Sequence, residues 1–255
     1  MSAPGGTGSR GGPKALARGA GVLYLLVAVS TVFAGVVNTH LLEPGDAAAT
    51  ADALRASAAL SRVALVSELL GAVCFLLTSM VLHRLLRRTD RAAAAAMVVF
   101  VAVSVAMQCL NLVHRSAALT VATGRGHSGA PGPVGPDEQA LLFAGMYQDG
   151  FLLSQTFFGL WLIPLGYLVA RSGLFPKALG VLLVIGCAGH LTDVLTRLAA
   201  PGIGEAVSPF AMVPAAVAEI SFIVWLLVKG ARHREPEAPA ADTAAPAERP
   251  SVPEP

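Results

Sequence analysis

The sequence predicts an all-α integral membrane protein, a bundle of six transmembrane helices. The chain of 255 residues is 55% apolar and only 13% charged, with a mean hydropathy of +0.66, which is too apolar for an ordinary soluble domain. Six apolar runs are each about as long as a helix that crosses roughly 30 Å of hydrocarbon. Apolar residues surround each run instead of forming one stripe, so these segments are not amphipathic surface helices.

The six predicted spans form one domain over residues 14–234. We expect helices because a backbone exposed to lipid has to satisfy its hydrogen bonds within its own segment. Residues 1–13 and the Pro/Ala/Glu-rich residues 235–255 are predicted to be disordered, because such compositions cannot build a core. The spans are 19–37, 63–82, 92–113, 150–170, 178–198 and 209–228.

The first span follows three basic residues, Arg10, Lys14 and Arg18. A basic start, an apolar run and the small residues Ala34 and Gly35 also resemble a cleaved signal peptide. The run is long for a signal peptide, so we predict that it is retained as a span.

Local signals place the other boundaries. Asp46, after the turn signal Pro44-Gly45, can cap an Ala-rich helix that we expect to lie on the outer surface and to run into the second span. Pro176 can open the fifth span. Pro164 and Pro214 each remove a backbone donor inside a span, which predicts a kink or a broken helix that lines a cavity.

Basic residues are distributed unevenly around the spans. With the N-terminus taken as cytoplasmic, twelve lie inside (Arg10, Lys14, Arg18, Arg84, Arg87, Arg88, Arg91, Arg171, Lys177, Lys229, Arg232 and Arg234) and five outside (Arg55, Arg62, Arg115, Arg125 and Arg197), leaving aside Arg249 in the tail. This bias predicts that both termini lie in the cytoplasm. Because the charges flank spans and do not gather on one face, nucleic acid is not an expected partner.

Several side chains have no predicted function. Cys74, Cys109 and Cys187 fall inside spans, which argues against a disulfide framework. Tyr24 and Tyr147 are predicted to pack or to anchor the chain at the membrane interface. The sequence contains no phosphate loop, dinucleotide fingerprint or nucleophile elbow, so no cofactor is expected.

Five spans carry polar residues that should lie in the outer half of the bundle or near its middle. His190, Asp193 and Arg197 stand at positions i, i+3 and i+7 and therefore share one helix face. A charge costs about 2.5–3.5 kcal/mol at the centre of a bilayer, so these groups should face the bundle interior and have partners. The candidate ligand-binding or proton-binding residues are Glu68, Gln108, Asn111, His114, Asp149, His190, Asp193, Arg197 and Glu219.

This polar set has three possible interpretations. In the structural one, Asp193 pairs with Arg197 or Arg115 and polar contacts hold the helices together. In the second, the groups line a water-filled cavity that is open to the outside and binds a small solute, an ion or a proton. In the third, the protein is a membrane metalloenzyme for zinc or manganese, although no HExxH or Cys-rich motif supports it. Its candidate ligands are His190, Asp193, His114 and Glu68.

Two stretches carry a family resemblance, LLEPGDAAATADALRASAALSR (41–62) and FFGLWLIPLGYLVARSGLFPKALGVLLVIG (157–186). Their most specific part is the core Trp161–Gly166, followed by Ser172 and Pro176. With them, residues 14–230 resemble a multispanning bacterial membrane family catalogued as domain of unknown function 4386. The resemblance implies a helical bundle in the plasma membrane and implies no activity.

The sequence therefore favours a small-solute or ion permease, or a ligand-binding membrane module. The alternative from another class is a structural or partner-binding membrane protein without transport, and an enzyme is less expected than either. The expected partners are the lipid bilayer and a small solute or ion. The identity of that ligand and the oligomeric state are left open.

Overall fold

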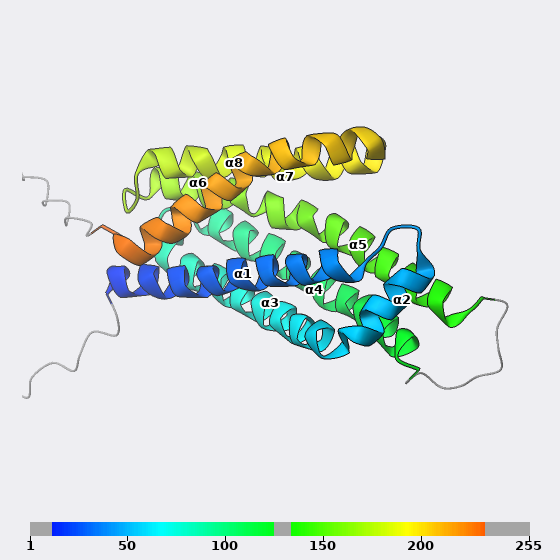
Figure 1. Cartoon of the computed structure of the whole chain (residues 1–255). Coiled ribbons are helices and arrows are strands. Elements are labelled where there is room, and N and C mark those ends of the chain that lie inside the picture. Colours follow the sequence, from blue (N-terminus) through cyan, green and yellow to red (C-terminus); the bar gives the residue numbers. More distant parts are fainter. Residues whose placement is uncertain (1–11, 125–133, 233–255) are drawn as a thin grey trace, which may run out of the picture.

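The computed structural model describes residues 12–124 and 134–232, and all regular structure in these ranges is α-helical (Figure 1). The six predicted spans are confirmed, since six segments are long and apolar enough to cross a membrane, with α5 and α6 forming one of them. Residues 1–11 and the predicted disordered tail 235–255 lie outside the described residues. The helices are α1 (Pro13–Leu41), α2 (Ala47–Ala56), α3 (Ala58–Leu86), α4 (Arg91–Ala122), α5 (Pro136–Leu160), α6 (Leu162–Arg171), α7 (Lys177–Ala199) and α8 (Pro201–Val228).

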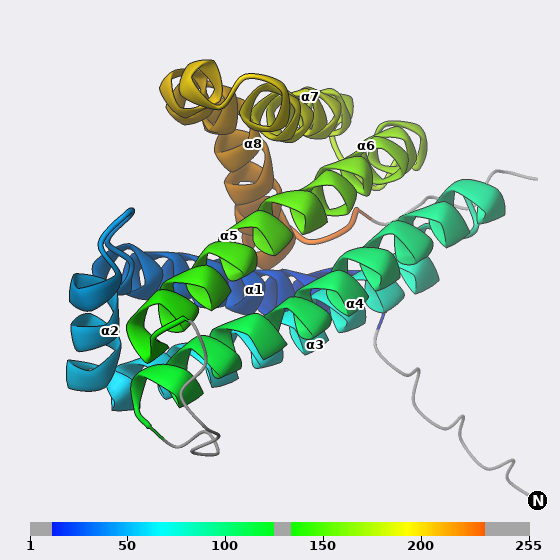
Figure 2. The same ribbon diagram turned by 90° about the vertical axis from the view of Figure 1, so that its right-hand side faces the viewer.

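The long helices run up and down between two ends of the bundle. One end, here called the α2 end, carries α2 and the α7–α8 turn, whereas the termini end carries the start of α1, the end of α8 and the α3–α4 and α6–α7 turns (Figure 1). The closest helix pairs are α1 with α3, α4 with α5, and α7 with α8. Figure 2 shows the α7–α8 hairpin to one side of α1, α3, α4 and α5.

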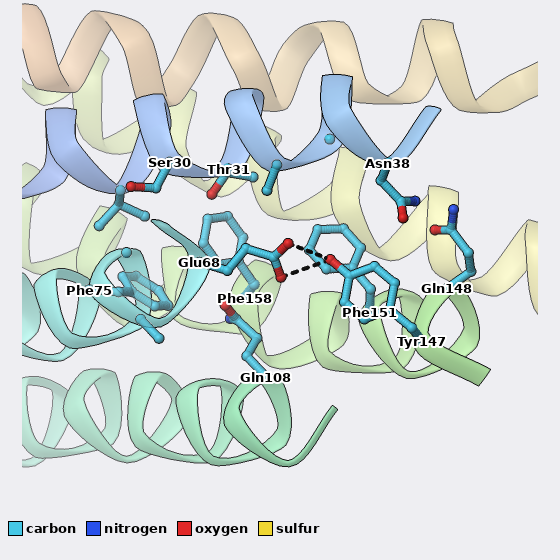
Figure 3. A pocket seen from close by; sticks show the side chains of 15 residues that line it. Ser30, Thr31, Asn38, Glu68, Phe75, Gln108, Tyr147, Gln148, Phe151 and Phe158 are labelled. Carbon is cyan, nitrogen blue, oxygen red and sulfur yellow. Dashed lines mark hydrogen bonds between the residues drawn. The ribbon is translucent and has the colours of Figure 1, made fainter. Parts of the chain in front are cut away.

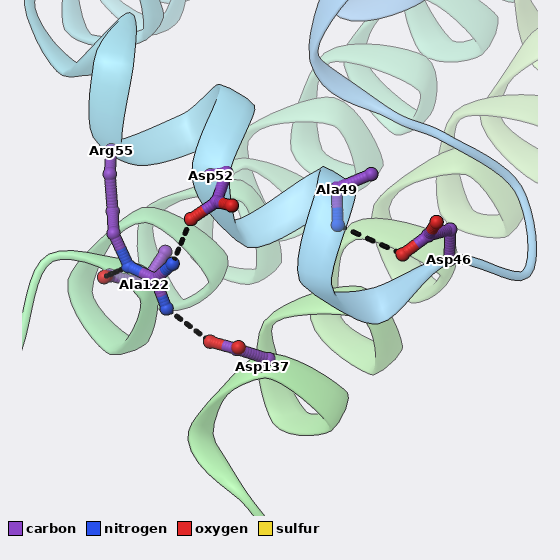
Figure 4. Close-up of polar contacts among 6 residues, drawn as sticks. All are labelled: Asp46, Ala49, Asp52, Arg55, Ala122 and Asp137. Atoms are coloured by element: carbon purple, nitrogen blue, oxygen red, sulfur yellow. Dashed lines mark hydrogen bonds and ion pairs between the residues drawn. The ribbon is translucent and has the colours of Figure 1, made fainter.

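Two helices begin where local signals predict. The short helix α2 begins after Asp46, whose Oδ1 accepts a hydrogen bond of 2.9 Å from the backbone N–H of Ala49, as in a side-chain N-cap (Figure 4). It ends at Ala56, and α3 follows directly at Ala58. The helix α7 begins at Lys177, directly after Pro176.

One arginine joins α2 to two other helices at this end of the bundle (Figure 4). Arg55 Nε donates a hydrogen bond of 2.9 Å to the backbone oxygen of Ala122 at the end of α4. The guanidinium also pairs with Asp52 on α2 and with Asp137 in the first turn of α5. The short helix is therefore held against α4 and α5 at this end.

The fourth span is interrupted at Trp161, before Pro164, and this fits the predicted kink, because Trp161 keeps helical φ and ψ of −63° and −23° and its N–H still donates to the oxygen of Phe157. The helix α5 ends at Leu160 and α6 begins at Leu162. Pro164 has no N–H and cannot donate the helical hydrogen bond to the backbone oxygen of Leu160. Trp161 at the break is fully buried, and its ring packs edge-on against Tyr24 and Phe75 with centroids 5.4 and 5.0 Å away. By contrast, α8 continues through Pro214 without ending.

Large apolar side chains cover the outside of the bundle as well as its core. Leu110 on α4 and Phe210 on α8 are 71% and 78% exposed. In water such a surface would aggregate, whereas hydrocarbon solvates it without cost. Together with the six spans, it identifies a multi-pass membrane protein.

Candidate functional site

The polar residues of the spans form two separate hydrogen-bonded networks. The Glu68 network consists of Glu68, Asn111, His114, Arg115 and Tyr147 and lies toward the α2 end. The Glu219 network consists of Tyr24, Gln155, His190, Asp193 and Glu219 and lies near the middle of the bundle.

The expectation of a single polar cluster is therefore corrected, because the two networks share no residue. The last helix begins at Pro201 and not at residue 209, so Glu219 lies past its middle, toward the termini end. Residues 201–208 extend the helix before the predicted span, and Pro201 is tolerated at its start because the first N–H groups of a helix have no partner within it.

In the Glu68 network, a carboxylate has two strong donors. Arg115 Nη1 pairs with Glu68 Oε1, and the Tyr147 hydroxyl donates to both carboxylate oxygens at 2.8 Å. The Arg115 guanidinium also lies 5.3 Å from the centroid of the Tyr147 ring. Arg115 is only 4% exposed, so the charges neutralise each other inside the bundle and not in solvent.

Amide side chains on α4 hold this network in place. Asn111 Nδ2 donates to the backbone oxygen of Tyr147 at 2.7 Å, and His114 Nδ1 lies 3.1 Å from Asn111 Oδ1. One turn earlier, Gln108 Nε2 donates to Ser104 Oγ at 3.0 Å. The close packing of α4 on α5 thus depends on polar contacts as well as on apolar ones.

In the Glu219 network, a second carboxylate is held by a tyrosine and an imidazole. Tyr24 on α1 donates its hydroxyl to Glu219 Oε2 at 2.6 Å. His190 Nε2 on α7 lies 2.8 Å from Glu219 Oε1. Three helices, α1, α7 and α8, therefore meet at one carboxylate.

Gln155 on α5 extends the network to Asp193. Its Nε2 donates to Asp193 Oδ2 at 3.1 Å and lies 3.3 Å from His190 Nδ1. If Nδ1 accepts this bond, Nε2 carries the ring proton and donates to Glu219, which is the pattern of a neutral imidazole. Asp193 Oδ1 is buried and has no hydrogen-bond partner among the described residues.

The predicted charge pairing was wrong. Asp193 pairs with neither Arg197 nor Arg115, because Arg115 forms its ion pair with Glu68 and Asp193 accepts a hydrogen bond from Gln155. Arg197 is exposed near the end of α7 and makes no ion pair within residues 12–124 and 134–232. A residue at a helix end can reach the aqueous boundary, so sharing a face with Asp193 did not make it a partner.

Two further predicted groupings do not form. Asp149 is exposed on α5 and belongs to neither network. The four candidate metal ligands are divided, with Glu68 and His114 in one network and His190 and Asp193 in the other. Across the described part of the chain, no three His, Cys, Asp or Glu side chains are placed to hold a metal ion together.

Three members of the networks were missed from the sequence. Tyr24 and Tyr147, predicted to be packing or interface residues, are 1% and 5% exposed and donate to the two carboxylates. Tyr24 lies roughly 16 Å from the start of α1 by helix rise, but only about 8 Å from the start of the predicted span at residue 19, so its depth could not be read from the sequence. The available signal in the sequence was Gln155, a lone amide side chain within the predicted fourth span.

A cavity lies between α1, α3, α4 and α5, against the Glu68 network (Figure 3). About 70 Å³ of it is open to the centres of water molecules. Figure 3 shows Ser30, Thr31 and Asn38 on α1 facing the hydrogen-bonded Glu68 and Tyr147. Other lining residues are Gln108, Gln148, Phe75, Phe151 and Phe158.

A family model described as "Domain of unknown function (DUF4386)" matches residues 19–230. The chain belongs to this family. The resemblance predicted from the two sequence stretches is thereby confirmed, and the DUF4386 region includes both networks and the cavity. The family description assigns no activity.

Other comparisons add little about function. An uncharacterized protein of Archaeoglobus fulgidus is 35% identical over 83 residues, which are 32% of this chain and 48% of that protein. The match thus spans about half of the archaeal relative. No solved structure matches this DUF4386 chain.

Proposed function

We propose that the cavity between α1, α3, α4 and α5 binds a small, uncharged polar solute. On this proposal the protein is a small-solute permease or a ligand-binding membrane protein. The observation that carries the proposal is a cavity inside a membrane bundle whose wall is lined with hydrogen-bonding side chains. A cavity of this size, with both polar and apolar lining, can hold several water molecules or a ligand of a few heavy atoms.

The chemistry of the wall favours a neutral ligand over an ion. The Glu68 carboxylate already has Arg115 and Tyr147 as partners, so it offers no free charge to a cation. Hydroxyl groups of Ser30 and Thr31 and the amides of Gln108 and Gln148 provide both donors and acceptors. Three phenylalanine rings supply the apolar part of the wall.

The cavity is placed to open toward the α2 end. Its lining on α1 runs from Val27 to Asn38, about 16 Å by helix rise, and Asn38 lies in the last turn of the helix. A second, smaller cavity shares Asn38 and Tyr147 and reaches Ser61, whose buried Oγ has no described partner. Water at this position would connect the wall of the main cavity to the α2 end.

We also propose that the termini end faces the cytoplasm and that the bilayer is a plasma membrane. The excess of Lys and Arg on the predicted inside segments supports this orientation. The α2 end, and with it the mouth of the cavity, then faces outside.

Cysteine accessibility tests whether the cavity meets water. In a chain with its three native cysteines replaced by serine, Thr31→Cys places a thiol in the cavity, and Val32→Cys places one on the lipid-facing surface at the same depth. We expect a small charged thiol reagent, added outside intact cells, to label the Thr31→Cys variant at least tenfold faster than the Val32→Cys variant. A thiol in hydrocarbon does not ionise and is not reached by a charged reagent.

The competing structural role predicts a different result. Equal, slow labelling of both variants in inserted protein would mean a sealed core and would overturn the proposal. With fast labelling, glycerol and urea at high concentration can be screened as probes, since a solute that occupies the cavity slows the reaction at residue 31.

A further inference from the structure

A second concave surface lies at the termini end, on the lipid-facing side of α3 and α4. It is a groove of about 690 Å³ whose walls are apolar side chains of both helices. Three basic residues, His83, Arg84 and Arg87, close it at the α3–α4 turn. The apolar lining residues are Leu77, Met80, Val81, Ala95, Val98 and Val99.

The cations stand on the same helix faces as the apolar walls. On α3, Leu77, Met80, Arg84 and Arg87 follow each other at spacings of three and four residues and so form one stripe. Each of these four side chains is exposed. The charged groups therefore lie at the end of the groove that is nearest the α3–α4 turn.

The turn itself concentrates positive charge. Arg84, Arg87, Arg88 and Arg91 are all exposed, and none makes an ion pair with a residue in 12–124 or 134–232. Asp90 lies among them, but its Oδ1 caps α4 by accepting from the backbone N–H of Ala93 at 3.0 Å. A second concavity, formed by residues 87–91, continues from the groove over the turn.

The dimensions of the groove match one leaflet of a bilayer. From Leu77 to Arg87, α3 rises about 15 Å, which is half of a hydrocarbon core of roughly 30 Å. An acyl chain that lies along this stripe would place the phosphate of its own headgroup at the level of the arginines.

We propose that this groove is a binding site for a phospholipid with an anionic headgroup. One acyl chain lies between α3 and α4, and the phosphate is held by Arg84 and Arg87, with Arg88 and Arg91 nearby. Arginine binds phosphate bidentately, and basic pockets between membrane helices favour anionic lipid. This site is separate from the cavity of the proposed function and does not depend on it.

The test compares two lipids on the purified full chain in neutral detergent. Dioleoyl phosphatidylglycerol should raise the thermal unfolding midpoint at lower concentration than dioleoyl phosphatidylcholine. The double variant Arg84→Gln/Arg87→Gln should need about 30-fold more phosphatidylglycerol for half of the shift. A matched control, Arg171→Gln/Lys177→Gln, removes two cations from the α6–α7 turn at the same end and should keep the wild-type response.

A second pair of variants tests the groove and not the charge. Val99→Trp fills the groove and leaves the cations in place, whereas Val113→Trp adds the same side chain to an exposed position of α4 outside it. We expect only Val99→Trp to weaken the response to phosphatidylglycerol.

The proposal is overturned by any of three results. One is an unchanged response in the Arg84→Gln/Arg87→Gln variant, or an equal loss in its control. Another is an unchanged response in Val99→Trp, which would mean that the arginines attract the lipid headgroup but that the groove does not bind its acyl chain. The third is the same shift with inorganic phosphate alone.

Discussion

Two buried carboxylates in this protein are satisfied in the same way. Glu68 accepts from the Tyr147 hydroxyl and pairs with Arg115, and Glu219 accepts from the Tyr24 hydroxyl and lies within hydrogen-bond distance of His190. A tyrosine suits this position because its ring packs among apolar side chains while its hydroxyl provides a donor. Each carboxylate thereby joins three helices.

The first prediction concerns the Glu68–Arg115 pair. Arg115→Gln should lower the free energy of unfolding by about 3–5 kcal/mol, because it leaves a buried carboxylate without its cation. The double variant Glu68→Gln/Arg115→Gln should recover at least half of this loss, because neither charge remains. Reversible unfolding in mixed micelles measures all three proteins.

The matched control is Arg62→Gln, the same change at an exposed residue on α3. It should change the free energy of unfolding by less than about 0.5 kcal/mol. If Arg115→Gln behaves like this control, or if the double variant is no more stable than the single one, the pair does not act as described.

At the scale of elements, small residues decide which helices can touch. A Cβ added at Gly180 on α7 would lie 2.8 Å from the backbone nitrogen of Ala170, and one at Gly166 on α6 would lie 2.8 Å from Val184 Cγ2. These two glycines face each other, so the α6–α7 hairpin is closed by backbone against backbone. Such contacts are typical of helix pairs in membranes.

We therefore expect Gly180→Ala to destabilise the protein by about 1–3 kcal/mol, because α6 and α7 must separate. The control is Gly19→Ala on α1, where an added Cβ meets no heavy atom within 4 Å. It should be neutral or stabilising by up to about 1 kcal/mol, since Ala favours helix over Gly. Thermal unfolding of both variants in the same detergent makes the comparison, and equal effects would contradict the packing argument.

At the scale of the whole molecule, the described structure is a six-span bundle whose two ends differ. The α2 end carries α2, which Arg55 joins to α5, and the termini end carries the exposed arginines of the α3–α4 turn. The cavity occurs where α1 and α5 have almost no direct contact, and α3 and α4 complete its wall.

The orientation of the bundle can be tested with two cysteines in the chain without native cysteines. Glu43→Cys lies in the α1–α2 connection and Lys177→Cys at the α6–α7 turn, and both positions are exposed. An impermeant thiol reagent should label only Glu43→Cys in intact cells and both variants after lysis, because the basic segments are retained inside. Labelling of Lys177→Cys alone in intact cells would invert the topology.

Local chemistry was enough to predict most of the fold. Apolar runs predicted the six spans, Asp46 predicted the start of α2, and Pro164 predicted the interruption of the fourth span. These features depend on hydropathy, on helix capping and on a missing N–H, and each of them is local in the sequence. The need for partners of buried charges was also predictable, since it follows from the cost of a charge in lipid.

The tertiary structure alone decided which partners meet. Asp193 and Arg197 share a helix face, yet the structure pairs Arg115 with Glu68 across two helices and leaves Arg197 exposed. Tyr24 and Glu219 are 195 residues apart and form one hydrogen bond. Periodicity fixes a residue's face and depth, whereas contacts between helices depend on which neighbours pack and at what rotation. The sequence by itself thus determined the spans and the helix faces that carry polar residues, and packing determined the two networks and the cavity.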